Sequence, residues 1–437
     1  MKRINKSVIA ISFFIGIANA NAQEKKQITL DEAVQLGIQN SKSLKIDAAK
    51  IEEATADLLA AKNRQLPDLS VSASYLYLPL KPTIDLKIPG VSAAGGPEVH
   101  QVAYGSANLT VPIYSGGRIK YGIQSAKYLV EASKLSSEND KVAIAYNVAQ
   151  AYNNLFKANQ SIKVLQENLS ASAKRDETFL KLENNGVIAR NDRLKANLQT
   201  SNIELQLLEA QNNYSIANIN MDLLLGLPET TEIEVDQNYI DEASDLKPVS
   251  FYVNEAYENR NDLKSLDQQR KAAELGTRSA KAENLPSIAF TGGYVAADIP
   301  KFLTIYNAVN VGVGISYNLS NLWKENSALK QSKAREMQLS ATNELLNDNI
   351  KLEVNREYQN SDYSKKRIAV FEKAAVQANE NYRITKNKYD NGLATMTELL
   401  DADAAQIAAN VGVINAKADA VLAYRKLLQT TGTLTIK

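Results

Sequence analysis

The chain has 437 residues and an almost balanced charge, with 50 Lys and Arg against 49 Asp and Glu. This balance provides no basic field for wrapping nucleic acid. The sequence has no Cys and a single His, His100, so thiolate nucleophiles, disulfides, Cys/His zinc sites and His-based triads are excluded. We therefore expect neither an enzyme nor a cofactor or metal site.

Residues 1–22 are typical of a secretory signal peptide. Lys2, Arg3 and Lys6 give a cationic start, and an apolar run over Val8–Ala18 leads to two Ala-x-Ala patterns that end at Ala22. A short membrane anchor is the alternative, but this run is too short to span roughly 30 Å of hydrocarbon. No other long uncharged apolar stretch follows, so we expect an exported protein without a transmembrane helix.

The chain repeats itself along its length. The segment Asn63–Tyr75 aligns with Ala282–Tyr294, and later Gly186 aligns with Gly392 and Gly226 with Gly432. The separation between aligned residues changes once, across an insert in the first half. The alignment predicts two structural repeats, over residues 23–226 and 249–437, joined by a linker over 227–248. The insert Pro79–Pro97 is predicted to be a loop in the first repeat.

In chain order, the first repeat begins with a predicted helix over Leu30–Gln65 that ends at Leu66-Pro67. Strands are predicted over 67–79 and 101–114, where apolar residues alternate with small or polar ones. Residues 118–183 contain no Pro and predict a helix of roughly 100 Å. A turn over 184–191 and a helix over 192–225 complete the repeat.

The second repeat predicts strands over 286–296 and 308–319, a helix over 324–388, a turn over 389–396 and a helix over 397–430. The clearest strand is Val309–Leu319, whose apolar residues alternate with small polar ones. The last helix of each repeat also has heptad spacing, which predicts coiled-coil packing.

The strands could form a soluble sandwich or a membrane barrel. We expect only four strands in the chain. Their polar faces consist of small residues, as if they lined a lumen, and Tyr and Trp residues gather near the strand ends, as at membrane interfaces. Four strands cannot close a barrel, and open sheet edges are not tolerated in lipid. We therefore expect a membrane barrel shared among copies of the chain.

In their duplicated order, these features resemble the TolC-type outer-membrane efflux protein family, the outer membrane factors. The resemblance covers nearly all of the mature chain, and it rests on the signal peptide, the repeat, and the motifs Leu66-Pro67, Leu285-Pro286, Val111–Gly117, Asn185-Gly186 and Asn391-Gly392. It implies a mainly α fold with a membrane β-barrel portion. Three protomers would form one 12-stranded barrel in the outer membrane, continuous with a helical α-barrel in the periplasm.

The resemblance also implies a function. The homotrimer would be the exit duct of a tripartite efflux pump or a type I secretion system, gated at its periplasmic tip. It would dock onto a periplasmic adaptor (membrane fusion) protein and an inner-membrane transporter. The alternative is a secreted coiled-coil structural or adhesion protein whose strands form a soluble cap.

The resemblance assigns gate residues by their distance from the turn glycines. Asp192 and Tyr389 would link neighbouring tip helices, and Glu398 and Asp401 would form acidic rings in the constriction. Such rings would favour cations and raise some carboxylate pKa values by mutual repulsion. The alternatives are a helix cap for Asp192, packing for Tyr389 and solvated helix-end charges for Glu398 and Asp401.

The sequence departs from the family at one gate position. Family members with a well-described gate have an Arg two positions after the second turn glycine, where this chain has Ala394. Arg190 or Arg193 in the first turn could substitute. Adaptor contacts are expected from residues at and around the two turns, namely Gly186, Val187, Ile188, Gly392, Leu393 and Met396.

Overall fold

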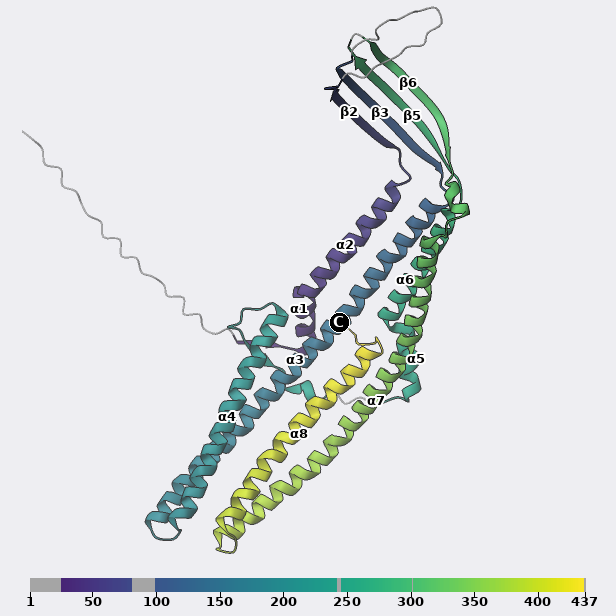
Figure 1. Cartoon of the computed structure of the whole chain (residues 1–437). Coiled ribbons are helices and arrows are strands. Elements are labelled where there is room, and N and C mark those ends of the chain that lie inside the picture. Colours follow the sequence, from purple (N-terminus) through teal and green to yellow (C-terminus); the bar gives the residue numbers. More distant parts are fainter. Residues whose placement is uncertain (1–24, 81–98, 242–244, 301, 436–437) are drawn as a thin grey trace, which may run out of the picture.

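The computed structural model describes residues 25–80, 99–241, 245–300 and 302–435. The protomer is elongated, with a four-stranded sheet at one end and two long helical hairpins that run away from it (Figure 1). The expected signal peptide, and all but the start of the insert Pro79–Pro97, lie outside the described residues.

The elements of the two repeats follow the same order. The first half contains β1 (Lys25–Ile28), α1 (Leu30–Asn40), α2 (Lys42–Asn63), β2 (Asp68–Tyr77), β3 (Gln101–Tyr114), α3 (Arg118–Asn184) and α4 (Arg190–Leu225). The linker contains β4 (Glu232–Val235) and the 3-10 helix η1 (Gln237–Asp241). The second half contains α5 (Val249–Asn259), α6 (Asn261–Ala282), β5 (Ser287–Ile299), β6 (Leu303–Ser316), the 3-10 helix η2 (Leu319–Leu322), α7 (Ser327–Asp390) and α8 (Met396–Thr430).

The first predicted helix, over Leu30–Gln65, is in fact two helices. The backbone leaves the helical region at Ser41, with φ −58° and ψ 121°, and the Ser41 hydroxyl accepts the N–H of Leu44 at 3.3 Å. Ser41 therefore caps α2. The second repeat breaks in the same way at Arg260, between α5 and α6, with φ −63° and ψ 120°.

The expectation of only four strands is wrong, because the described residues contain six. β1 pairs in parallel with β4, and Lys25 lies opposite Glu232. Each of these strands has four residues, which is too short for an alternating pattern to be visible.

The main sheet is antiparallel, with the order β2-β3-β5-β6. Its last strand begins earlier than predicted, at Leu303, and ends at Ser316 instead of Leu319. The earlier end has a local cause, since the Asn318 side chain accepts the N–H of Ser320 at 3.2 Å and turns the chain into η2.

The alternation of residues gives this sheet two different faces. One face presents the apolar side chains of the two edge strands, and Val71 on β2 and Val311 on β6 are 78% and 72% exposed. The opposite face is lined by small polar groups. There Ser72 and Ser106 lie opposite each other on β2 and β3, with 2.9 Å between their hydroxyl oxygens.

The helices form a wall that continues from the sheet. α3 packs against α2 and α6 near the sheet and against α4 and α8 farther away, while α7 packs against α6 and then α8. One margin of the wall therefore contains α2 and α4, and the other contains α7. These are also the sides of β2 and β6 (Figure 1).

The largest buried cluster lies where the linker meets the helices, and Tyr152 of α3 is at its centre. The Tyr152 hydroxyl donates to the Ile28 carbonyl at 3.0 Å and accepts the Asp236 N–H at 2.7 Å. Burial raises the pKa of Tyr152 to about 12, so the hydroxyl stays protonated and keeps this donor. None of the described helices combines the length and apolar content that a transmembrane helix needs.

Candidate functional site

The two hairpin turns have the same backbone geometry. Gly186 and Gly392 lie in the left-handed region, with φ of 70° and 74°. In the first turn the N–H of Val187 bonds to the Leu182 carbonyl at 2.9 Å, and in the second the N–H of Leu393 bonds to Lys388 at 2.7 Å. These are Schellman closures, which require a residue such as Gly after the helix end. Gly186 and Gly392 therefore provide the left-handed backbone conformation that the two turns require.

The residues around the turn glycines differ in their exposure. Val187 and Leu393 are 67% and 77% exposed and are available for a partner. Ile188 is half-buried, and Met396 is only 3% exposed. Met396 therefore supports the protomer from within and presents almost no surface for docking.

A small apolar cluster joins the ends of the two hairpins. It consists of Phe179 on α3, Ala196 on α4, and Met396 and Leu399 on α8. Tyr389 packs its ring edge-on against Phe179, with 5.8 Å between ring centroids. Burial, and then the negative charges of Asp192 and Asp390, raise the pKa of Tyr389.

The structure brings Asp192 into the surroundings of Tyr389 within one protomer. Asp192 does not cap its helix, because the N-cap of α4 is Ala189 and Asp192 lies in the first turn. One of its carboxylate oxygens lies 3.7 Å from Lys195 Nζ. Asp192 is thus a charge near the phenol of Tyr389.

Glu398 and Asp401 are both exposed on α8, one turn apart. The carboxylate of Glu398 accepts the N–H of Thr395 at 2.7 Å, and its own N–H bonds to the Thr395 hydroxyl at 3.3 Å, which forms a capping box. These bonds lower the pKa of Glu398 in the protomer, opposite to the direction expected for a ring of repelling carboxylates.

Arg193, one of the two suggested substitutes for the missing gate arginine, is already bound. Its Nε donates to the Glu183 carboxylate across the first hairpin. Arg190 is exposed on the same helix. Of the two, only Arg190 is placed to reach outside its own hairpin.

One buried ion pair between the hairpins could not be predicted from the sequence. Arg175 of α3 donates through Nη2 to Asp403 of α8 at 2.6 Å and through Nη1 to the Tyr382 hydroxyl of α7 at 3.2 Å. The side chains of Arg175 and Asp403 are only 14% and 7% exposed. Burial alone would lower the pKa of Arg175, but the Asp403 carboxylate and the Tyr382 hydroxyl raise it above its usual value.

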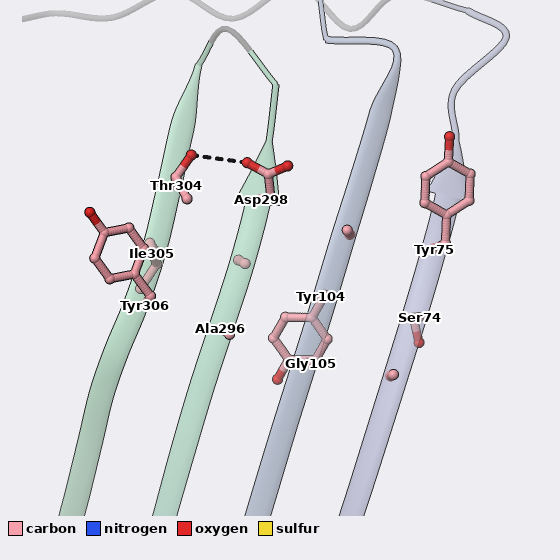
Figure 2. Close-up of a pocket in the computed structure, with 12 residues that line it drawn as sticks. Ser74, Tyr75, Tyr104, Gly105, Ala296, Asp298, Thr304, Ile305 and Tyr306 are labelled. Carbon is pink, nitrogen blue, oxygen red and sulfur yellow. Dashed lines mark hydrogen bonds between the residues drawn. The ribbon is translucent and has the colours of Figure 1, made fainter.

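At the far end of the sheet, an open hollow crosses all four strands (Figure 2). Small residues such as Gly105 on β3 and Ala296 on β5 lie between the edge strands β2 and β6, which contribute Tyr75 and Tyr306. The Thr304 hydroxyl donates to Asp298 at 2.9 Å. Within the described ranges, no three His, Asp or Glu side chains converge as a metal site would require.

A sheet with one apolar and one polar face, continued by long helical hairpins, is the architecture of an outer-membrane channel protein. The outer membrane efflux protein family matches residues 33–227 and 252–433, and the chain belongs to this family. The family expected from the sequence is therefore confirmed. The protein is located in the outer membrane, and its helices extend into the periplasm.

Solved structures show the same fold at low sequence identity. A membrane protein from Pseudomonas aeruginosa is 18% identical, with a TM-score of 0.80 and 92% of each chain covered. The outer membrane protein VceC from Vibrio cholerae is 18% identical, with a TM-score of 0.76 over 92% of this chain and 96% of that one. The Campylobacter jejuni CmeC outer membrane channel is 18% identical, with a TM-score of 0.76 over 99% and 94%. None of the curated proteins compared with the chain matches it.

Proposed function

We propose that three copies of the chain form one outer-membrane duct. The observation that supports this proposal is the open sheet, in which β2 and β6 each have a neighbour on one side only. β3, β5 and β6 have 13 or 14 residues, enough to cross a bilayer at a tilt. Four strands cannot close on themselves, whereas pairing β6 of one copy with β2 of the next gives a closed 12-stranded barrel without edges.

The helical wall has matching open margins. On α4, apolar side chains on one helical face remain 42% to 64% exposed, a stripe formed by Leu194, Leu198, Leu205, Leu208, Ile216, Ile219 and Leu223. On α7, a second exposed stripe contains Leu345, Leu352, Tyr363 and Val370. Exposed apolar stripes of this length mark interfaces. We infer that α4 of one copy packs against α7 of the next, on the same sides as β2 and β6.

In this trimer the polar sheet face lines the lumen and the apolar face contacts lipid. We propose that the duct is the exit path of a tripartite efflux pump or a type I secretion system, and we assign it no catalytic role. Its periplasmic adaptor would contact the exposed turn residues Val187 and Leu393, and the adaptor would join the duct to an inner-membrane transporter.

The same proposal assigns the gate to the hairpin ends. Three copies of Glu398 and Asp401 would surround the axis, and Asp192 and Tyr389 would lie at the contacts between tip helices. A threefold ring of carboxylates concentrates negative potential in a narrow bore and favours cations.

Two measurements test this function. Light scattering of the detergent-purified protein should give the mass of a trimer, and a monomer would refute the proposal. In planar bilayers we expect cation preference, and replacing Glu398 and Asp401 with Ala should weaken it. Glu209→Ala, which removes an exposed carboxylate of α4 far from the turns, is the control. Selectivity unchanged by the double variant would remove both residues from the gate.

A further inference from the structure

A groove of about 550 Å³ lies where β3 ends and α3 begins. This is the boundary between the sheet and the helical wall (Figure 1). The groove is lined by the end of β3, by the first turns of α3 and by a residue just beyond α2. Its volume lies in the range of sites that hold small ligands.

The strand register places one wall of the groove on the apolar face of the sheet. Leu109 of β3 lies opposite Gly292 of β5, which in turn lies opposite Val311 on that face. Ile113 comes four residues after Leu109 and therefore points the same way. A shift of register at the end of β3 turns Tyr114 to this face as well. Ile113 and Tyr114 are 62% and 46% exposed, so the apolar face continues into the groove.

The other wall, formed by α3, carries two cations. Lys120 and Lys127 are both exposed and line the groove, and their seven-residue spacing puts them on one face of α3, roughly 10 Å apart along its axis. Ile123 lies between them on the same wall. Of the residues that the structure describes, no Asp or Glu lines the groove and no carboxylate pairs with either Lys. Both ammonium groups are therefore available to an anionic ligand.

We propose that this groove binds an anionic phospholipid of the periplasmic leaflet. The acyl chains would lie against Ile113 and Tyr114, and the phosphate would lie against Lys120 and Lys127. The helices extend into the periplasm, so the strand end of the groove faces hydrocarbon and its helical end faces the lipid head groups. Basic residues beside a membrane-spanning segment attract anionic lipids, and Lys can cover apolar surface with its methylene groups while its ammonium group stays at this level. The inference rests on the proposed trimer, which puts the apolar sheet face in lipid.

The second repeat has different residues at the matching junction. The alignment of the two repeats places Glu325 over Ile119 and Asn326 over Lys120. The Asn326 side chain donates to the Ala280 carbonyl at 3.3 Å, so it is used within the protomer. A carboxylate at the position of Glu325 repels an anionic head group. We therefore expect one lipid site in each copy of the chain, at the first junction.

Native mass spectrometry of the full chain in detergent, with dioleoyl phosphatidylglycerol added, measures the number of copies and the lipids bound to them. We expect one phosphatidylglycerol per copy to bind at least about tenfold more tightly than phosphatidylethanolamine, whose head group has no net charge. Each Lys next to an anionic lipid should contribute about fivefold, so Lys120→Gln with Lys127→Gln should lower the affinity for phosphatidylglycerol at least about tenfold. Both side chains are exposed, so this variant should fold as the parent does.

Lys134→Gln with Lys141→Gln is the matched control. These residues have the same seven-residue spacing on α3, but they lie outside the groove and face Glu131 and Glu138 at 3.8 Å and 2.6 Å. We expect this variant to change the affinity less than about twofold, because salt screens charges at this distance from the groove. An equal loss in both double variants, or equal affinities of the parent for the two lipids, would overturn the inference.

A further pair of variants tests the charge of the groove. Ile119→Glu introduces the residue of the second repeat and should lower the affinity for phosphatidylglycerol more than Ile119→Gln, which has a similar size and no charge. Glycerol 3-phosphate in large excess tests the role of the acyl chains, because it carries the phosphate without them. It should not displace the lipid, and displacement would overturn the assignment of a lipid site.

The same spectra distinguish this inference from the proposed trimer. A trimer that binds both lipids equally refutes the lipid site alone. A monomer whose lipid binding still depends on Lys120 and Lys127 refutes the trimer and supports the lipid site.

Discussion

Asp222 should make the stability of the fold depend on pH. This residue lies near the end of α4 with no exposed surface, and one of its oxygens accepts the side-chain N–H of Asn218 at 2.9 Å. The other oxygen has no hydrogen-bond partner among the described residues. Burial, and then repulsion by Glu229, raise the pKa of Asp222 to about 6.

The sign and size of the effect follow from this shift. The folded chain holds the proton more tightly than the unfolded chain, whose Asp has a pKa near 3.8. The contribution of Asp222 to the free energy of unfolding is therefore greatest below about pH 4, falls as the pH rises towards 6, and is constant above that. A shift of about 2 units corresponds to a loss of about 3 kcal/mol.

Asp222→Asn keeps the acceptor for Asn218 and removes the titration. Relative to the parent, we expect the variant to gain about 2 to 3 kcal/mol in free energy of unfolding between pH 4 and pH 7.5. Guanidinium unfolding in detergent, followed by far-ultraviolet circular dichroism at both pH values, measures this difference. Glu229→Gln should give a smaller change of the same sign. A variant that follows the parent at both pH values would refute the argument.

Three other outcomes follow from the structure. Gly186→Ala and Gly392→Ala should each lower the free energy of unfolding by about 1 kcal/mol from backbone strain alone, because a Cβ at either position meets no atom within 4 Å. Gly226→Ala should lower it more, since its Cβ would lie 2.8 Å from Asn40 Cβ. Denaturant unfolding compares the three. Val311→Arg on the apolar sheet face should cost about 2 to 4 kcal/mol in a bilayer, whereas Ser70→Arg on the polar face should be tolerated; the fraction of folded trimer after insertion into vesicles distinguishes them. Asp403→Asn should lower the free energy of unfolding by about 3 to 5 kcal/mol. Urea titration should show a much smaller loss when Arg175→Gln is combined with Asp403→Asn, because both side chains are then neutral.

Local patterns allowed much of the fold to be predicted from the sequence. The turn glycines, the Leu-Pro junctions and the long Pro-free segments each constrain the backbone next to them, and the duplication made each pattern visible twice. The break at Ser41 was missed because Ser is tolerated within helices and reveals itself as a cap only through its contacts.

The remaining features depend on residues far apart in the chain. Nothing near Arg175 or Asp403 marks them among so many charged residues, because their burial results from the packing of α3 against α8. Met396 next to a turn looked available for docking, but the neighbouring hairpin covers it. The placement of Glu398 and Asp401 about a common axis stays a prediction.

The pairing of β1 with β4 has a consequence for the order of assembly. Lys25 of β1 lies opposite Glu232 of β4, so β1 can pair with β4 only after about half of the polypeptide has been synthesised. Closing so long a loop costs chain entropy that later contacts must offset. A nascent chain that stops before Glu232 would therefore leave β1 unpaired, and its free backbone groups could pair with other chains.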